Sequence, residues 1–408
     1  MNPLSVFYCR CFQGLLRFVM HFVKIPEPAV ENGKGAFAQI VPFLEKRKAS
    51  HPLLVVGEHA YASGRTKPLQ EAFEGKVSYS VYAKGKEDPT IKEVEDAYQA
   101  YQKEGCDSLV AFGGGSILDL AKALGARVSN PKVPLRKMKG VLKIRHPLPP
   151  LIAIPTTAGT GSEATLAAVV TDEQNGDKYA INDPKLVPAL ALFDSSLLLS
   201  LPPKQIAYSG LDALTHAVES FLGNSSTKKT EKDALTSARL IFENLLPFYE
   251  NPKDEEAATR MLEASYLAGL SFTRAYVGYV HALAHAIGGY YHLPHGFLCA
   301  LILPKVLKAY GKKAERKLSR LEAIRCPEKR GSDSELAQDF LTWLKSFERQ
   351  LGIPEKLDHV IRREDLDALS RHAAKEANPL YPVPKELSAK ELKQILIDCD
   401  VAFEGQAE

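Results

Sequence analysis

Short apolar runs alternate with helical patterns through the first half of the chain. The apolar runs occupy residues 53–56, 77–83, 108–112, 151–154 and 189–193. Between the second and third runs, Asp88-Pro89-Thr90 forms a helix start signal, and apolar residues follow at helical spacing, at Ile91, Val94, Tyr98 and Tyr101. Strands that alternate with crossover helices are the signature of a parallel sheet, so this half predicts an α/β domain.

The pattern changes near residue 200. From about residue 203 onward, β-branched runs largely disappear and long amphipathic stretches follow, with predicted breaks at Pro247, Pro304 and Pro354. A chain of 408 residues suits two domains. We therefore expect an α/β domain over residues 22–200 and an all-helical domain over residues 201–408.

Residues 1–21 are apolar and contain Arg10 and Arg17 but no acidic residue. The two arginines interrupt the apolar run, which leaves no secretory core and no stretch of the roughly 20 residues that a bilayer span needs. We expect a poorly ordered extension here, with contact to a membrane surface as the alternative. No other segment indicates a membrane.

Composition and charge narrow the class of partner. Hydrophobic residues make up 45% and charged residues 25% of the chain, and the net charge is only +3. That charge is too small to indicate nucleic-acid binding, so a small-molecule partner is expected. The six cysteines form neither a disulfide framework nor a paired-cysteine zinc site, which favours the reducing cytoplasm.

A glycine-rich turn follows the third apolar run. Gly113, Gly114, Gly115 and Ser116 lead directly into a predicted helix that contains Asp119 and Lys122. Glycines let the backbone approach a phosphate closely, and a helix N-terminus adds a positive dipole end. The turn matches neither G-x-G-x-x-G nor a P-loop, and a merely tight strand-to-helix turn is the alternative.

A second loop, at residues 153–165, favours the phosphate-binding interpretation. It follows another buried strand and interleaves glycines with hydroxyl side chains, namely Thr156, Thr157, Thr160 and Ser162. Two such loops after successive parallel strands fit a dinucleotide that crosses the carboxyl edge of the sheet.

Four histidines lie within the segment HALAHAIGGYYHLPH, which predicts a metal site. His281 and His285 are four apart and share one helix face. Gly288-Gly289 end that helix, and Pro294 prevents its restart before His295, so His295 is expected on a returning loop. Spacing alone does not say which histidine binds metal and which transfers protons.

An anionic ligand is available upstream in GLDALTHAVE. Asp212 and His216 are four apart on a predicted amphipathic helix, so both side chains can reach one ion. In the later cluster of four histidines, the sequence leaves open whether His292 binds metal or is structural.

Read in order, GGGS, PTTAGTGSE, GLDALTHAVE and HALAHAIGG…PHG resemble the iron-containing (group III) alcohol dehydrogenase family. The resemblance covers nearly everything after about residue 22 and extends to DPKLVPALALFD and ANPLYPVP. It implies an N-terminal α/β dinucleotide-binding domain with a Rossmann-like parallel sheet and an all-α C-terminal domain, the dehydroquinate synthase-like architecture. It also implies a catalytic divalent metal between the two domains.

The resemblance divides the residues by role. It implies Asp212, His216, His281 and His295 as metal ligands, His285 as a proton relay near the nicotinamide, and no role for His292. The positions expected on the cofactor side are Gly57, Gly113, Gly114, Gly115, Ser116, Asp119, Thr156, Thr157, Thr160 and Lys178.

Gly57 departs from the pattern of NAD-specific members, which place an Asp there to bind the ribose 2′-hydroxyl. Glu58 follows, but in an extended chain it points to the opposite side. Gly57 leaves room for a 2′-phosphate, with His59, Arg65 and Lys67 as partners, so the sequence favours NADP(H). A shift by one residue would make Glu58 the acid and favour NAD(H).

The expected activity is reversible hydride transfer between a small or primary alcohol, or its aldehyde, and the nicotinamide. The resemblance favours Fe²⁺, although Zn²⁺ and other divalent metals suit the same ligands. One alternative is a dehydroquinate synthase-like lyase or cyclase, which returns its cofactor unchanged. Another is a metal-dependent hydrolase, which gives the two glycine loops no purpose. Family members often form homodimers, although the sequence itself leaves the oligomeric state of this chain open.

Overall fold

The computed structural model describes residues 1–33, 35–174 and 177–403 of the chain. By its contacts the chain divides into two compact units, Lys24–Ser200 and a second unit that combines Met1–Val23 with Leu201–Glu408. Among the described residues, no helix is both long and apolar enough to span a bilayer.

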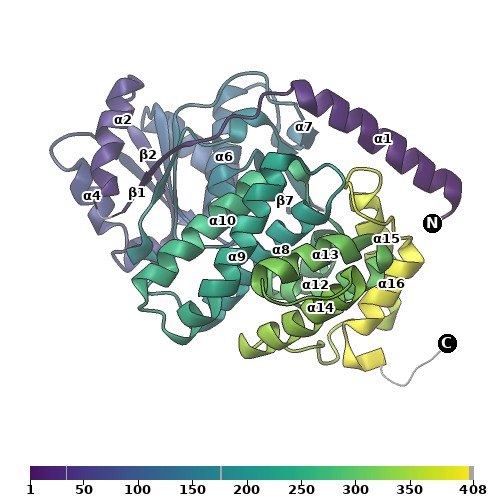
Figure 1. Cartoon of the computed structure of the whole chain (residues 1–408). Helices are drawn as coiled ribbons and strands as arrows, with labels where there is room; N and C mark the ends of the chain where they lie inside the picture. Colours follow the sequence, from purple (N-terminus) through teal and green to yellow (C-terminus); the bar gives the residue numbers. More distant parts are fainter. Residues whose placement is uncertain (34, 175–176, 404–408) are drawn as a thin grey trace. The chain divides into compact units, whose positions relative to one another are not determined.

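A six-stranded parallel sheet forms the centre of the unit Lys24–Ser200, in the order β1-β9-β6-β4-β2-β3 (Figure 1). Its strands are β1 (Ala29–Asn32), β2 (Pro52–Gly57), β3 (Ser80–Gly85), β4 (Ser108–Gly113), β6 (Leu151–Pro155) and β9 (Leu190–Phe193). The α/β fold and its parallel sheet are therefore confirmed. The apolar run 77–83 predicted β3 three residues too early, and β1 was not predicted.

Helices and a small second sheet complete this unit. Its other elements are α2 (Ile40–Lys46), α3 (Glu58–Ala62), α4 (Lys67–Phe73), α5 (Ile91–Lys103), α6 (Gly115–Ser129), α7 (Leu135–Met138), β5 (Gly140–Val141), β7 (Ala167–Asp172) and β8 (Asp177–Asn182). The predicted crossover helix is α5, which begins at a capping box between Thr90 and Glu93. The antiparallel pair β7–β8 was not predicted.

The second unit is helical, as the sequence predicts. Its long helices are α8 (Pro203–Leu222), α9 (Lys228–Glu250), α10 (Glu255–Ala275), α11 (Tyr279–Tyr291), α12 (His295–Tyr310), α13 (Lys312–Arg325), α14 (Asp333–Gln350), α15 (Leu366–Ala377) and α16 (Ala389–Asp398). Two predicted breaks are wrong, because Pro247 lies inside α9 and Pro304 inside α12. A proline removes one backbone hydrogen bond, and around Pro304 the burial of Leu303 and Val306 offsets that loss.

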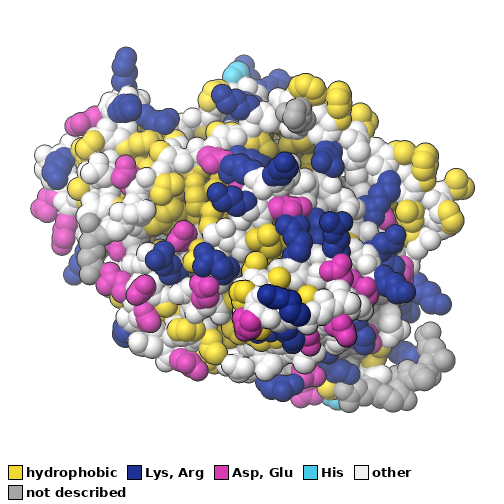
Figure 2. Space-filling model, viewed as in Figure 1, with side chains coloured by type: hydrophobic (Ala, Val, Ile, Leu, Met, Phe, Trp, Pro, Cys, Tyr) yellow, Lys and Arg dark blue, Asp and Glu magenta, His cyan; other side chains and the backbone are white. Residues whose placement is uncertain are grey.

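The expected poorly ordered extension is instead a helix, α1 (Pro3–Phe22). Asn2 caps it, since Asn2 Oδ1 accepts a hydrogen bond from Ser5 N at 2.8 Å, and Pro3 occupies its first position. One face buries Cys9 and Gln13. Figure 2 shows the other face lined with hydrophobic side chains.

Candidate active site

Four polar side chains from α8, α11 and α12 converge in the helical unit. One ligand atom from each of Asp212, His281, His295 and Cys299 lies within 4.8 Å of the other three. Asp212 Oδ1 lies 3.5 Å from His295 Nε2 and 3.8 Å from His281 Nε2. The structure thus brings together three of the four predicted ligands.

Two of these atoms point to a cation. Asp212 Oδ1 and His281 Nε2 are buried, and neither has a hydrogen-bond partner in the described part of the chain. A buried polar atom without a partner is costly, and a divalent ion between a carboxylate oxygen and an imidazole nitrogen removes the cost at both. The residues present therefore fit the implied metal.

Glu219 contacts the His281 ring at Nδ1, whereas the ring's Nε2 faces Asp212. Its Oε2 lies 2.6 Å from His281 Nδ1 and accepts a hydrogen bond from Gly278 N, while Oε1 accepts from Val280 N, both at 2.8 Å. Burial lowers the pKa of His281 to about 3, so the ring is neutral, the form that binds metal. The sequence analysis did not identify Glu219. The signal that could have found it is its position one helical turn after His216, on the same helix as Asp212.

His216 lies beside this group. Its Nδ1 is 3.9 Å from Asp212 Oδ2, one helical turn away, as the spacing predicts. Its ring stacks on Phe272 with centroids 4.1 Å apart and lies 4.4 Å from the ring of His281.

His295 is the first residue of α12 rather than part of a loop, so that prediction is wrong about the element. Helix α11 continues through Gly288 and Gly289 to Tyr291, and the chain then returns through His292 and Pro294. Glycine in a helix costs only about 1 kcal/mol relative to alanine, and here the helix buries most of its length. His292 ends α11 in the left-handed region with φ 53° and is exposed, which agrees with a structural role.

Cys299 follows His295 by one turn of α12, and its Sγ lies 3.5 Å from His295 Nε2. Burial raises the pKa of the Cys299 thiol well above its ordinary value, so the apo form is a neutral thiol. The i, i+4 spacing from His295 was the signal that could have found it.

His285 stands next to the cluster without joining it. Its ring stacks on His295 with centroids 5.1 Å apart, and its Nδ1 lies 2.8 Å from Glu376 Oε1 of α15. The His285 side chain is 27% exposed, whereas that of His281 is 3% exposed. His285 therefore occupies the more open side of the group.

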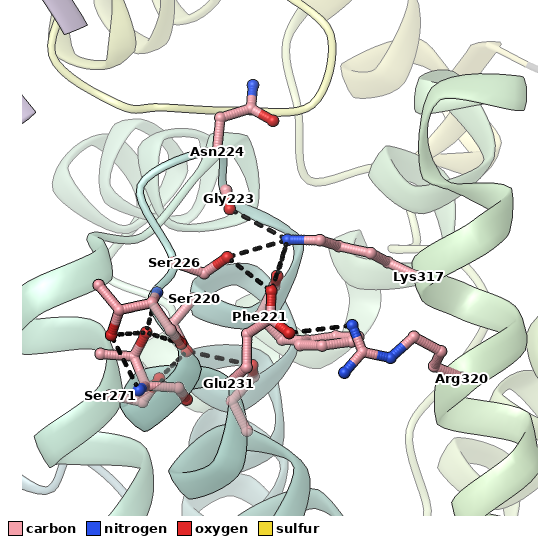
Figure 3. Close-up of polar contacts among 12 residues, drawn as sticks. Ser220, Phe221, Gly223, Asn224, Ser226, Glu231, Ser271, Lys317 and Arg320 are labelled. Carbon is pink, nitrogen blue, oxygen red and sulfur yellow. Dashed lines mark hydrogen bonds and ion pairs between the residues drawn. The ribbon is translucent and has the colours of Figure 1, made fainter. Parts of the chain in front are cut away.

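The end of α8, the helix that carries Asp212, His216 and Glu219, is fixed by Lys317 (Figure 3). Lys317 Nζ donates to Phe221 O at 2.6 Å and to Gly223 O at 3.2 Å, where the helix leaves carbonyls without internal partners. Ser271 Oγ of α10 also donates to Ser220 Oγ at 2.8 Å. These bonds hold the C-terminal end of α8 in place.

The glycine turn lies in the other unit, where β4 ends and α6 begins. Gly114 is the N-cap of α6 and supplies no side-chain cap, so the first backbone N–H groups are available to an anion. A Cβ on Gly115 would lie 2.5 Å from Thr160 Cγ2, and one on Gly113 would lie 2.6 Å from the Ile117 side chain. The turn therefore requires glycine and touches the second loop.

Hydrogen bonds from β4 and α6 hold the second loop, residues 153–165, in place. Thr156 N donates to Gly113 O at 3.0 Å, and Ser162 Oγ donates to Asp119 at 2.6 Å. Asp119 also accepts from Val169 N at 3.0 Å, while Lys122 Nζ donates to Ser162 Oγ at 2.8 Å. Asp119 thus braces the loop, and Thr157 lies beside Gly114, 3.2 Å from the position of a Cβ there.

The remaining residues that the sequence predicts on the cofactor side lie at strand ends. Gly57 ends β2 and pairs in register with Gly85 of β3. Lys178 of β8 pairs with the Asp88 carboxylate, and Asp88 N donates to Ser116 Oγ at 3.4 Å.

Comparison with known proteins agrees with this geometry. The family model described as iron-containing alcohol dehydrogenase matches residues 28–195, and the model of the family's C-terminal part matches residues 206–399. Alcohol dehydrogenase 4 of Saccharomyces cerevisiae is 34% identical over 85% of this chain and 90% of its own length. Lactaldehyde reductase of Escherichia coli is 30% identical over 84% and 90%, respectively.

Solved structures share the fold. An alcohol dehydrogenase from Oenococcus oeni superposes with a TM-score of 0.87 at 29% identity, covering 92% of this chain and 99% of its own. With matched segments across both units and the expected polar clusters in each, the chain belongs to the iron-containing alcohol dehydrogenase family.

Proposed function

We propose that this chain interconverts a primary or small alcohol and its aldehyde, with residues 22–200 binding the cofactor and residues 201–408 binding the metal. The chain is a metal-dependent alcohol dehydrogenase that uses a nicotinamide cofactor. The observation that carries the residue assignment is the pair of buried atoms without hydrogen-bond partners in the described chain, Asp212 Oδ1 and His281 Nε2.

Asp212, His216, His281 and His295 are the proposed metal ligands. Fe²⁺ is the proposed native ion from the family, and Zn²⁺ or another divalent metal suits the same nitrogen and oxygen donors. When bound, the ion supplies Lewis-acid polarisation of the substrate oxygen. Glu219 holds the His281 ring so that Nδ1 donates backward and Nε2 faces Asp212.

His285 is the proposed proton relay. Its Nδ1 donates to Glu376 Oε1, which leaves Nε2 as an acceptor for the hydroxyl proton of the alcohol. Partial exposure of the ring gives that proton a route toward solvent.

The glycine turn and the N-terminus of α6 are the proposed pyrophosphate site, with Thr156, Thr157 and Thr160 opposite. We propose NADP(H) as the preferred cofactor. Support comes from Gly57 and its register partner Gly85, neither of which places a carboxylate where a 2′-phosphate would lie.

The proposed setting is the cytoplasm, and the proposed assembly is a homodimer. Support for the cytoplasm comes from the six cysteines, which form no disulfide with one another. The proposed substrates are small alcohols and aldehydes, the kind of compound named for the relatives.

An anaerobic assay of aldehyde reduction tests this proposal. A panel of small aldehydes is run with NADH and NADPH, and the metal content is measured on the same sample. Net oxidation of the reduced cofactor excludes both a lyase, which returns its cofactor unchanged, and a hydrolase. Failure with both cofactors after iron and zinc loading would overturn the proposal.

A further inference from the structure

We propose that Glu376 and Tyr381 are positioning residues for His285, and that helix α1 holds the segment that carries Tyr381. This inference rests on the proposed relay role of His285. It concerns side chains to which the sequence assigned no role, although Tyr381 lies within the segment ANPLYPVP.

One carboxylate oxygen connects the two side chains. Glu376 Oε1 lies 2.8 Å from His285 Nδ1 and accepts a hydrogen bond from Tyr381 Oη at 2.9 Å. An ionised carboxylate only accepts hydrogen bonds, so the imidazole must donate from Nδ1. The pair therefore selects the tautomer in which Nε2 is the acceptor and sets the plane of the ring.

Glu376 carries the charge that this arrangement needs. Burial opposes ionisation, but the adjacent His285 ring and the two hydrogen bonds hold the pKa of Glu376 below its ordinary value. The His285 ring also stacks on His295 at an interplanar angle of 17°, so its orientation is defined on two sides.

Tyr381 lies on residues 378–388, an irregular segment between α15 and α16 that is rich in proline. Prolines lack an N–H, so such a segment is held mainly through its carbonyl groups. Helix α1 supplies several of the donors, and Asn224, just after α8, supplies others. Gln13 Nε2 donates to Tyr381 O at 2.9 Å and to Pro379 O at 3.2 Å.

Arg10 completes the attachment one turn earlier on α1. Its guanidinium donates to Val383 O at 2.8 Å and to Pro384 O at 3.0 Å, and its Nε lies 2.7 Å from the buried Glu386 carboxylate. Four carbonyls on both sides of the Tyr381 side chain are thus bound by two residues of α1.

Helix α1 lies outside the matched family segments, which begin at residue 28. The family models therefore do not describe this helix. In this chain α1 acts on that chemistry through the path Arg10 and Gln13, Tyr381, Glu376 and His285.

The first test replaces the carboxylate. Glu376→Ala should lower kcat by about 10- to 100-fold, the loss that removal of an outer hydrogen-bond partner typically causes. KM for the cofactor should not change. Glu376→Gln should recover part of kcat, because its amide oxygen still accepts from Nδ1. Tyr381→Phe should lower kcat by a few-fold.

A solvent isotope effect separates positioning from structural damage. If His285 transfers the proton, Glu376→Ala should show a larger solvent isotope effect on kcat than the parent, at equal metal content. Equal kcat per bound metal in parent and Glu376→Ala would overturn the positioning role. His285→Ala with parental kcat would instead overturn the relay of the proposed function, so the two failures are distinguishable.

The second test addresses α1. Arg10→Ala with Gln13→Ala in the full chain should reproduce a several-fold loss of kcat with unchanged cofactor affinity. Arg260→Ala is the matched control, since Arg260 is exposed on α10 and pairs with Glu263 of the same helix, away from the proline-rich segment. Parental kcat in the double variant, with α1 still helical, would overturn the role of α1.

A separate observation concerns the outer face of α1, defined as Leu4, Tyr8, Cys11, Leu15 and Phe18. Successive residues of this face are separated alternately by four and three residues, which is the spacing at which one helix packs along another. Leu4 is 81% exposed, and Leu15 and Phe18 are each 64% exposed. A helix that is apolar on two opposite faces is normally covered on both.

We infer that this outer face packs against α1 of a second copy of the chain. The face carries no charged residue, and Arg10 and Arg17 both donate to carbonyls of their own chain. A helix on a lipid surface instead uses basic residues on its polar face. The five side chains of this face, at roughly 100 Å² each, give about 500 Å² per partner, and the adjoining exposed Phe7 and Phe22 bring the area closer to the ~800 Å² of a standard interface.

Sedimentation of the parent and of Leu15→Glu with Phe18→Glu tests this inference. The parent should be a dimer and the variant a monomer with normal helix content. Gln338→Glu with Thr342→Glu adds the same charges to exposed positions of α14 and should remain a dimer. A monomeric parent, a dimeric outer-face variant, or binding of the parent to phosphatidylcholine vesicles through α1 would overturn it.

Discussion

Glu219 Oε2 lies 2.6 Å from His281 Nδ1, while the Nε2 of the same ring faces Asp212 Oδ1 at 3.8 Å. Both side chains are buried, and two backbone N–H groups hold the carboxylate in place. The ring is therefore oriented before any ion arrives. A preoriented neutral imidazole loses little freedom on binding and offers its lone pair directly.

Removing this support should weaken metal binding. We expect Glu219→Ala to lower metal affinity by about 10- to 100-fold, because Nδ1 loses its acceptor and the ring its orientation. Metal titration into the apo protein measures the change. Glu243→Ala, at an exposed position of α9, serves as the control, and equal affinity in Glu219→Ala and parent would contradict the argument.

Two glycines should respond in opposite ways to alanine. Gly115→Ala places a Cβ 2.5 Å from Thr160 Cγ2, so we expect the turn to shift and cofactor affinity to fall by at least about tenfold. Gly289→Ala meets no atom within 4 Å and should stabilise α11 by up to about 1 kcal/mol. Fluorescence of bound NADPH and thermal unfolding measure the two effects. Unchanged affinity in Gly115→Ala would show that the turn is not the phosphate site.

A single substitution should change the cofactor preference. A Cβ at Gly57 would lie 3.4 Å from Gly85 O, an ordinary contact, so the backbone there accepts a side chain. An aspartate carboxylate would repel a 2′-phosphate, and we expect Gly57→Asp to shift kcat/KM toward NADH by at least about tenfold. Glu58→Gln is the companion variant. If Glu58→Gln changes the cofactor preference more than Gly57→Asp does, Glu58 is the carboxylate that binds the ribose 2′-hydroxyl, and the NADP(H) proposal is wrong.

Glu163, buried in the second loop, should make stability depend on pH. Burial raises its pKa from 4.5 to about 7, so the folded state favours the neutral acid. Its contribution is complete below the unfolded pKa and is lost as pH rises through about 7. Glu163→Gln should therefore gain stability over the parent at pH above about 7, by up to about 3 kcal/mol, and little below about 4.5. Denaturant unfolding across this range checks it, and a pH-independent difference would refute it.

The fold was largely predictable because hydrophobic periodicity differs between the two halves. Buried parallel strands such as β4 appear as continuous apolar runs, and α5 begins with a clear capping box. Prolines were less informative, since packing keeps α9 and α12 helical through Pro247 and Pro304. Helix α1 was missed because its apolar face suggested an unanchored extension, whereas Arg10 and Gln13 attach it to a distant segment.

The candidate site was predictable where its residues share one helix turn. Asp212 and His216 illustrate this, because i, i+4 spacing fixes a common face. Contacts between distant segments left no such pattern. Glu376 lies 91 residues from His285, and Glu219 lies 62 residues from His281, so only the folded chain reveals these carboxylate–imidazole pairs.

The central claim is tested most directly by measuring metal content and aldehyde reduction in His281→Ala. His292→Ala, prepared in the same way, is the comparison. His292 is exposed at the end of α11 and has no proposed ligand role, so its variant should retain stoichiometric metal and parental activity. His281→Ala should retain neither. A His281→Ala protein with stoichiometric metal and full activity would contradict the proposed site.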